Sequence, residues 1–265
     1  MKKAIVVAHP DDEVLFFSSV LEAVDQIIVC FGPSSNDDVT NGRKELQSRY
    51  PLKNIEWLNV EESNVFRSGN WNSPKLNDCG MVVSRNKNDY EKNFNHLAEL
   101  LKLKLSSFDV VYTHNPWGEY GHEEHISVFR AVCVATKSTK PSIYVSSYLS
   151  DRSKKVFDIQ KALLGPELIV GSIPTNLCHS IKSLYMENNC WTWNDDYIWP
   201  YTELFIKIND LSVPTKNKYQ NPTANPPVLL LTMSFKQSLL GTLVRRMLPK
   251  ALKTYIKNLL KKVRK

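Results

Sequence analysis

The chain has 265 residues, of which 42% are hydrophobic and 23% are charged, as is ordinary for a globular protein with one good-sized core. Its formal net charge of +7 is unevenly distributed: residues 235–265 hold ten Lys or Arg and no acid. In the rest of the chain, 24 basic residues are outnumbered by 27 acidic ones. A mildly acidic body does not suit wrapping a polyanion, so we expect no nucleic-acid partner.

Strands and helices are predicted to alternate through the first 150 residues. An apolar, β-branched run at 4–8 is short enough for a buried strand, and a helical pattern of apolar residues follows from Val14 to Leu21. Further strands are predicted at 26–31, 54–60, 108–113 and 142–148, helices at 41–50, 88–103, from 126 onward and at 176–188, and an edge strand at 155–159. This order predicts an α/β, Rossmann-like fold with a mostly parallel sheet and helices on both faces.

Composition divides the chain into three predicted parts. Residues 1–208 form the main domain, 209–227 a linker rich in Pro, Asn, Thr and Lys, and 228–265 a basic amphipathic helical tail. Within the main domain, 61–88 has no regular pattern. Long loops of this kind are usually functional or disordered, so we interpret 61–88 as a substrate loop or lid, with a surface insertion as the alternative.

The tail carries an apolar stripe edged by lysines. Leu239, Leu243, Leu252 and Ile256 belong to this stripe, a pattern typical of a helix at a membrane interface. We therefore expect 235–265 to bind an anionic membrane surface; a terminal helix packed on the acidic body is the alternative.

No signal peptide or apolar span is evident, and the five cysteines form no Cys-x-x-Cys pair. We expect a cytoplasmic protein, held peripherally at the cytoplasmic face of the membrane.

The first predicted strand ends in a run of one histidine and three acids, His9-Pro10-Asp11-Asp12-Glu13. In open α/β sheets, ligands bind at the carboxyl ends of strands. His9 and Asp12 are three residues apart, so their side chains can converge on one metal ion. The alternative is an acidic helix start that complements the helix dipole.

A second histidine-rich run follows the strand predicted at 108–113. His122 and His125 are three residues apart at a loop-to-helix junction, after Gly118 and Gly121, which permit a tight turn. A single histidine in this place would usually be structural. A His-x-x-Asp and a His-x-x-His, each following a strand, together predict a metal site.

The two runs resemble the LmbE/PIG-L family of zinc-dependent N-acetylsugar (N-acetylglucosaminyl) deacetylases. The resemblance rests on Ala8-His9-Pro10-Asp11-Asp12-Glu13 and on Gly121-His122-x-x-His125. It covers roughly the first half of the chain, with a looser likeness to about residue 206. Family members usually have Pro-Asp between the two histidines, where this chain has Glu123-Glu124; these positions are not metal ligands in the family.

Spacing and resemblance together assign His9, Asp12 and His125 as ligands of one Zn²⁺, or a similar divalent ion, per chain. Two histidines and one carboxylate leave an open position, as in catalytic zinc sites. Asp11 cannot easily share the same ion, and we expect it to act as general base. His122, if protonated, would stabilise the oxyanion. The resemblance implies both roles. Glu13 is expected to orient a ligand.

The predicted activity is hydrolytic removal of the N-acetyl group from an amino sugar, lipid- or nucleotide-linked, in surface glycan biosynthesis. Candidate substrate contacts are Arg43, Arg67, Trp117, Tyr120, Trp191 and Trp193. Aromatic faces hold sugar rings, although such clusters also make good cores. The alternatives are a zinc amidase or esterase on another acylated compound, and a non-catalytic sugar- or membrane-binding relative. The lack of Gly-x-Gly-x-x-Gly and of a P-loop disfavours nucleotide-cofactor chemistry.

Overall fold

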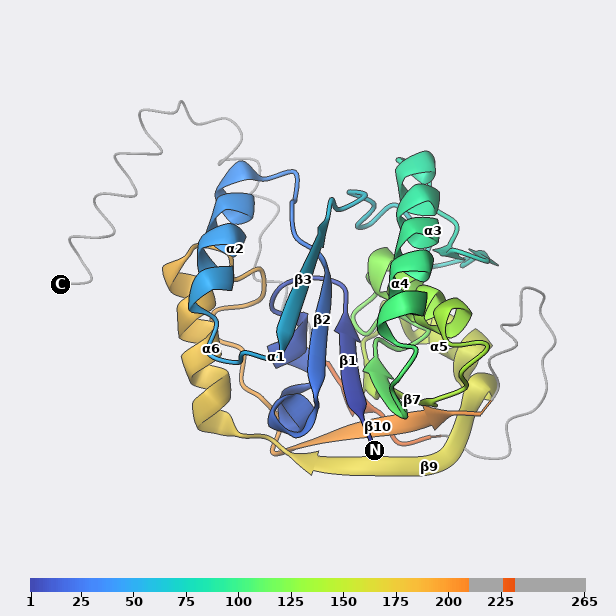
Figure 1. The fold of residues 1–265 in the computed structure, drawn as a ribbon. Coiled ribbons are helices and arrows are strands. Elements are labelled where there is room, and N and C mark those ends of the chain that lie inside the picture. The colour runs from blue at the N-terminus through green and yellow to red at the C-terminus, as the bar shows by residue number, and fades with distance from the viewer. Residues whose placement is uncertain (210–225, 232–265) are drawn as a thin grey trace. The chain divides into compact units, whose positions relative to one another are not determined.

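The computed structural model describes residues 1–209 and 226–231 (Figure 1). The elements are β1 (Lys3–Val7), α1 (Asp12–Phe16), the 3-10 helix η1 (Ser18–Ala23), β2 (Gln26–Phe31), α2 (Asp37–Arg49), β3 (Ile55–Val60), β4 (Leu76–Asn77), β5 (Gly80–Met81), α3 (Lys87–Lys104), β6 (Val110–Thr113), α4 (Glu123–Ala135), β7 (Ser142–Ser146), β8 (Tyr148–Leu149), α5 (Lys154–Gln160), the 3-10 helix η2 (Lys161–Leu163), β9 (Leu164–Ser172), α6 (Thr175–Glu187), β10 (Thr202–Ile208) and β11 (Leu229–Leu230). Among these residues, no helix has the length and apolar character needed to cross a membrane.

The central sheet has seven strands in the order β3-β2-β1-β6-β7-β10-β9. The first five are parallel, and β10 runs antiparallel to both of its neighbours, β7 and β9 (Figure 1). The predicted α/β fold with a mostly parallel sheet is therefore confirmed. The sequence reading did not find β9 and β10; the two glycines and the proline in Leu164–Ser172 hide the strand pattern there.

The edge strand predicted at 155–159 is wrong, because these residues lie in helix α5. Val156, Phe157 and Gln160 are its buried side chains, at positions i, i+1 and i+4 of one helical face. A stretch of five residues is too short for alternation to distinguish a strand from one turn and a half of helix.

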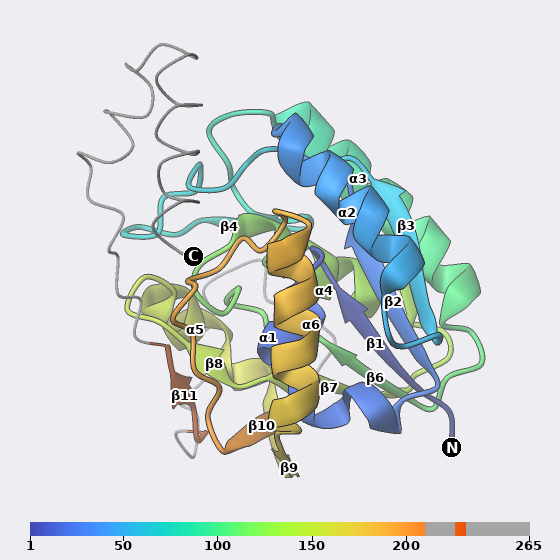
Figure 2. The same cartoon turned by 90° about the vertical axis from the view of Figure 1, so that its left-hand side faces the viewer.

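Helices cover both faces of the sheet because successive side chains of each strand point to opposite sides. In β1, Ala4 and Val6 join the core under α3 and α4, while Ile5 and Val7 join the core under α1, α2 and α6. Figure 2 looks onto the side covered by α2 and α6. All four of these β1 side chains are fully buried, because β1 lies inside the sheet between β2 and β6 and is covered on both faces.

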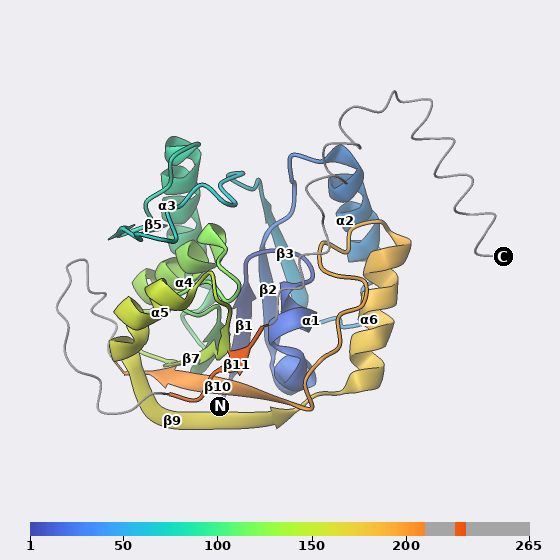
Figure 3. The same cartoon turned by 180° about the vertical axis from the view of Figure 1, so that it is seen from behind.

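The strand order reverses direction between β1 and β6. From β1 the chain passes outward to β2 and β3, and it later returns to β6 beside β1 and continues to β7. Such a topological switch point is where doubly wound sheets bind ligands, at the carboxyl ends of the strands. Helix α1 follows β1 and α4 follows β6, so both histidine motifs open at this edge (Figure 3).

The predicted linker and tail lie almost entirely outside the described residues. By its contacts, the chain divides into one unit of residues Met1–Leu231 and a second of Thr232–Lys265. Of the residues assigned to the tail, Leu229 and Leu230 form β11 and pair in parallel with β8 of the first unit. The amphipathic helix of the tail stays a prediction.

Candidate metal and catalytic site

The first motif is a tight turn between β1 and α1. Asp12 begins α1, and its Oδ2 accepts the backbone N–H of His9 at 2.7 Å. Asp11, the residue before the helix, has φ 98°, a left-handed conformation that strains any residue with a side chain. Backbone strain of this kind persists only where neighbouring groups hold it, and it gathers at functional sites.

Glu13 supplies that support. Its Oε2 accepts the N–H of Asp11 at 3.0 Å, and its Oε1 accepts the hydroxyls of Tyr50 and Tyr185 at 2.7 Å each. Burial raises the pKa of Glu13 to about 7, against the lowering effect of the two tyrosine hydrogen bonds. Glu13 therefore positions the backbone of the turn rather than a ligand side chain.

The second motif opens α4. The chain turns at Gly118, where φ is 69° and an added Cβ would lie 2.5 Å from the carbonyl oxygen of His122. His122 caps the helix, because its Nδ1 accepts the backbone N–H of Glu124 at 3.2 Å. His125 follows in the first turn, and its ring lies 4.8 Å from that of His122.

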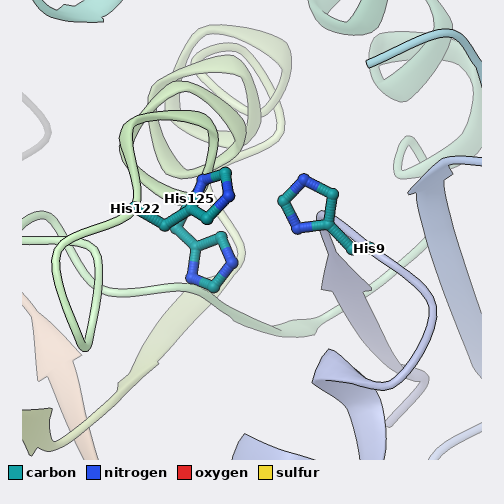
Figure 4. Close-up of side chains that lie close together, drawn as sticks. All are labelled: His9, His122 and His125. Atoms are coloured by element: carbon teal, nitrogen blue, oxygen red, sulfur yellow. The ribbon is translucent and has the colours of Figure 1, made fainter. Parts of the chain in front are cut away.

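Folding brings the two motifs together at the switch point. Oδ2 of Asp12 lies 3.1 Å from Nδ1 of His9 and 3.2 Å from Nε2 of His125. In Figure 4, the ring of His9 comes from the end of β1 and faces the rings of His122 and His125 at the start of α4. The three residues predicted as metal ligands thus share one buried place, although 113 residues separate Asp12 from His125.

Each of the two predicted histidine ligands is oriented by a carboxylate on its other ring nitrogen. Oε2 of Glu124 lies 3.0 Å from Nε2 of His9, and Oε2 of Glu119 lies 2.8 Å from Nδ1 of His125. Such carboxylates fix the ring orientation of metal-binding histidines. Burial alone would lower the pKa of His9, but the carboxylates of Asp12 and Glu124 outweigh it and raise that pKa to about 10.

His114, at the end of β6, is a further histidine near Asp12, with Nε2 3.4 Å from Oδ2. That Nε2 accepts the backbone N–H of Ala8 at 2.8 Å, so it is already occupied. Its Nδ1 lies 3.2 Å from Glu119. Burial opposes ionisation of Glu119, but His114 and His125 lower its pKa to about 2. We interpret His114 as a link between the strands and not as a ligand.

The residues fit a bound divalent cation. Nε2 of His125 is buried and has no hydrogen-bond partner within residues 1–209 and 226–231. Candidate ligand atoms of His9, His122 and His125 lie within 4.8 Å of one another, as do those of Asp12, His114 and His125. Burial would raise the pKa of Asp12, but the histidines, with His125 first, hold it well below its usual value, so the carboxylate is ionised. Imidazole nitrogen and carboxylate oxygen are the donors of catalytic zinc sites.

Asp11, the predicted general base, is held by the segment before β10. Its Oδ2 accepts both the backbone N–H of Thr192 at 2.9 Å and the Thr192 hydroxyl at 2.6 Å. Burial, together with the neighbouring charge of Asp12, raises the pKa of Asp11 to about 8. A carboxyl group with a pKa near neutrality is suited to exchanging protons at physiological pH.

His122 is placed to donate from its other nitrogen. Because its Nδ1 accepts from Glu124, the hydrogen of the neutral ring lies on Nε2. Burial, reinforced by His9 and His125, lowers the pKa of His122 well below its usual value. These neighbours favour the neutral ring, whereas the sequence analysis expects a protonated one. One face of the ring stacks on Phe66, with centroids 4.7 Å apart and planes at 14°.

Two of the six candidate substrate residues lie beside the histidines. The ring of Tyr120 lies 5.2 Å from that of His125 and 4.7 Å from that of Trp193. Both Tyr120 and Trp193 are partly exposed, so they form an aromatic wall open to solvent. Arg67 lies in the 61–88 loop, with its Cζ 5.3 Å from the ring centre of Phe66.

The other three candidates are engaged by other side chains or by the core. Trp117 is 0% exposed, and its indole N–H donates to the carbonyl of Tyr148 at 2.7 Å, so it is a core residue with no surface to offer a sugar. Arg43 is 3% exposed and is paired with Glu62. Trp191 packs beside Lys182, whose Nζ lies 5.4 Å from the centre of its ring.

Sequence reasoning missed the carboxylates that support the site. Glu123 and Glu124 were noted only as a departure from the family's Pro-Asp. Oε1 of Glu124 accepts the N–H of Ser63 at 2.6 Å, and Glu123 accepts the N–H of Gly69 at 2.8 Å and the indole N–H of Trp71 at 3.0 Å. These two residues therefore fasten the 61–88 loop to the start of α4. The sequence signal for this role is the pair of adjacent acids between His122 and His125.

A family model and a viral relative match this chain. A family model described as "PIG-L: GlcNAc-PI de-N-acetylase" matches residues 4–136, which is half of the chain. The chain is 28% identical over 161 residues to the uncharacterized protein L374 of Acanthamoeba polyphaga mimivirus. That match covers 56% of this chain and 63% of the relative's own length.

Solved structures of teicoplanin deacetylases share the fold. The zinc-inhibited form of teicoplanin deacetylase Orf2 superposes with a TM-score of 0.50 at 14% identity, covering 78% of this chain and 98% of that one. A deacetylase–bog complex from the teicoplanin biosynthesis pathway gives 0.51 at 13% identity, with the same coverage. At such identities the likeness shows the architecture. The family model, however, begins in β1 and ends just after α4, so it spans both histidine motifs, and the chain belongs to the PIG-L family.

Proposed function

We propose that the protein is a metal-dependent hydrolase that removes the N-acetyl group from an acetylated amino sugar. The observation that carries the proposal is the ionised Asp12 carboxylate between Nδ1 of His9 and Nε2 of His125, the latter buried and unpartnered in the described part of the chain. The description of the family model supports the reaction, and the teicoplanin deacetylases support a sugar substrate.

His9, Asp12 and His125 would hold one Zn²⁺ or a similar divalent ion. When bound, such an ion lowers the pKa of water toward neutrality and polarises an amide carbonyl. Three protein ligands leave room for water and substrate. The carboxylates of Glu124 and Glu119 contact the other ring nitrogens of His9 and His125 and so keep both rings oriented toward Asp12.

Asp11 would take the proton from the attacking water and deliver it to the leaving amine. Its strained backbone and its two hydrogen bonds from Thr192 fix the carboxylate next to Asp12 without adding a further ligand. His122 would donate its Nε2–H to the oxygen of the former carbonyl as negative charge develops there. The neutral ring needs no proton from solvent for this role.

Tyr120 and Trp193 would stack against the sugar. Their rings meet at 4.7 Å beside His125 and retain exposed surface. Aromatic side chains combine an apolar face with a polar tip, which suits a ring that carries hydroxyl groups. A lipid- or nucleotide-linked sugar in surface glycan assembly is the substrate we propose, with the protein in the cytoplasm.

The test is release of acetate from a panel of N-acetylated sugars, with and without prior chelation. Metal-dependent acetate release that is lost in Asp11→Asn supports the proposal. Hydrolysis of simple acyl esters or non-sugar amides, with no turnover of any acetylated sugar, would favour the alternative of an amidase or esterase. Sugar binding with no turnover of any substrate would instead identify a non-catalytic relative.

A further inference from the structure

The segment that joins α6 to β10, residues 188–201, carries two groups of the proposed active site. It contains no helix or strand, and Figure 2 shows it passing beside α6 on its way to β10. Thr192 gives two hydrogen bonds to Oδ2 of Asp11, and Trp193 forms the aromatic wall with Tyr120. Because the segment has no regular hydrogen-bond ladder, contacts with other elements decide where Thr192 and Trp193 lie.

The segment curls around one lysine of α6. Nζ of Lys182 donates to the backbone carbonyls of Asp195 at 2.5 Å and of Tyr197 at 3.3 Å. The same atom lies 5.4 Å from the ring centre of Trp191 and 5.7 Å from that of Trp199, distances at which an ammonium attracts an aromatic face. Lys182 therefore contacts the segment on both sides of the residues that face the site.

Lys182 is a buried cation, with 8% of its surface exposed. Burial lowers its pKa, although the charges of Asp195 and Asp196 raise it. A buried ammonium is costly unless polar groups compensate it, and two carbonyls of the segment do so here. Removing the ammonium should therefore release the segment, whereas removal of an exposed lysine has little effect.

Helix α6 is itself attached to the turn that holds Asp11. The hydroxyl of Tyr185 donates to Oε1 of Glu13 at 2.7 Å, and the carbonyl of Tyr185 accepts the N–H of Cys190 at 3.0 Å. Tyr185 lies three residues after Lys182, about one turn of the helix. The helix therefore gives Lys182 a fixed position relative to the strained turn.

Each site residue of the segment has a neighbour that Lys182 contacts. Thr192 directly follows Trp191, whose ring lies over Nζ. The ring of Trp193 meets the ring of Tyr197 edge-on, with centroids 6.1 Å apart, and the carbonyl of Tyr197 accepts from Lys182. A shift of either neighbour would therefore move the contact with Asp11 or the aromatic wall.

We propose that Lys182 is a positioning residue of the active site, which keeps Thr192 against Asp11 and Trp193 against Tyr120. The inference rests on the proposed deacetylase function and assigns it a residue outside the metal site. Loss of the Thr192 contact changes the position of Asp11, the group that transfers the proton. Loss of the aromatic wall changes where the sugar ring lies, so Lys182 affects both kcat and KM.

The experiment compares variants of Lys182 on N-acetylglucosamine, with zinc content and thermal stability measured in parallel. Lys182→Met keeps the stem and removes the charge. In the metal-loaded full chain it should lower kcat and raise KM, a combined loss of about 10- to 100-fold in kcat/KM, because displacing a reacting group by about 1 Å has an effect of this size. Lys182→Arg keeps the charge and can stack on tryptophan, so it should recover part of the loss.

Lys161→Met is the matched control. Nζ of Lys161 lies 5.8 Å from the ring centre of Phe157 and 3.2 Å from the carboxylate of Asp158, so this lysine also combines an aromatic contact with a polar one. It belongs to η2 and contributes nothing to the proposed site, and its loss should change neither constant. Unchanged kcat and KM in Lys182→Met would overturn the inference and leave the deacetylase proposal intact.

A double-mutant cycle separates positioning from a general loss of stability. Thr192→Val should lower kcat, and Trp193→Ala should raise KM. If Lys182 acts through these residues, Lys182→Met should lose at least half of its effect on kcat in the Thr192→Val background and on KM in the Trp193→Ala background. Fully additive effects in both cycles would mean that Lys182 stabilises the fold and positions neither residue.

Hydrogen exchange at Thr192 gives a readout that does not depend on activity. Its backbone N–H donates to Asp11, so its exchange rate reports directly how firmly the segment is held. The rate should rise about 10-fold in Lys182→Met, since hydrogen bonds to charged groups are strong, and stay unchanged in Lys161→Met. An unchanged rate in Lys182→Met overturns the inference. Absence of acetate release from every acetylated sugar in the wild type counts against the proposed function instead.

Discussion

Glu124 joins His9 to the 61–88 loop. One oxygen of its carboxylate lies 3.0 Å from Nε2 of His9, and the other accepts the N–H of Ser63 at 2.6 Å. Its own backbone N–H donates to Nδ1 of His122. A single residue thereby fixes a proposed metal ligand, the proposed oxyanion donor and the beginning of the loop that carries Phe66 and Arg67.

Glu124→Gln should weaken metal binding without unfolding the protein. The amide keeps the size of the side chain but removes the negative charge that makes His9 a better ligand. Loss of such an outer carboxylate typically costs 10- to 100-fold in metal affinity, and we expect about this loss in a zinc competition titration. Glu99→Gln, an exposed acid of α3, is the matched control. Unchanged zinc affinity in Glu124→Gln would show that the carboxylate does not support the ligand.

His125→Ala should abolish metal binding. The wild-type protein is expected to carry about one zinc per chain, because the three proposed ligands form one site. Removing the imidazole that faces Asp12 deletes one of these ligands from a place where the side chain is 0% exposed. Elemental analysis measures the stoichiometry, and His96→Ala, on the exposed side of α3, is the control. Full occupancy in His125→Ala would rule out the ligand assignment.

Asp11→Asn should separate chemistry from metal binding. The variant keeps the shape of the turn and its contacts with Thr192 but cannot accept a proton. A general base contributes about 10²–10⁴-fold, so kcat should fall by that amount while zinc content and thermal stability remain near wild type. The measurement is acetate release alongside elemental analysis. Normal turnover would require another base for the attacking water.

Stability of the metal-free protein should depend on pH through Glu203. Burial raises the pKa of this carboxyl to about 7 from its ordinary 4.5, although Ser18, Ser19 and Tyr148 donate to it. The folded state therefore binds the proton more tightly than the unfolded chain does. The contribution of Glu203 to the free energy of unfolding is complete below pH 4.5 and is lost as the pH rises through 7. The free energy of unfolding should fall by up to about 3 kcal/mol over this range.

The check is urea unfolding between pH 5 and 8. The free energy of unfolding should fall more steeply with pH in the wild type than in Glu203→Gln, which has no proton to lose. Glu13, whose pKa is also raised to about 7, contributes with the same sign in both proteins, so the difference isolates Glu203. Parallel pH profiles of the two proteins would mean that Glu203 is already ionised in the folded state.

Membrane binding by the basic tail stays a prediction from composition. Attraction to anionic lipid is worth about 1 kcal/mol per basic residue near the surface. The full chain should float with anionic liposomes and lose this binding in high salt, whereas a chain ending at Leu231 should not float. Ending there, rather than before residue 226, preserves the pairing of β11 with β8. Equal flotation of the two chains, or binding that ignores lipid charge, would contradict the anchor.

The sequence by itself determined the parts of this protein that depend on local signals. Short apolar runs indicate the buried strands. In each of the pairs His9–Asp12 and His122–His125, the two residues are three positions apart. A strand followed by a polar turn and a helix places its turn at the carboxyl edge of the sheet, so the two motifs could be assigned to one site before any coordinates.

The tertiary structure alone decided which distant groups complete that site. The Thr192 contact with Asp11 spans 181 positions, and the Ser63 contact with Glu124 spans 61. Burial likewise separated Trp117, a core residue, from Trp193, which reaches the aromatic wall. A tryptophan has the same local signature in both places, because whether its face meets solvent is set by the packing of elements far away in the chain.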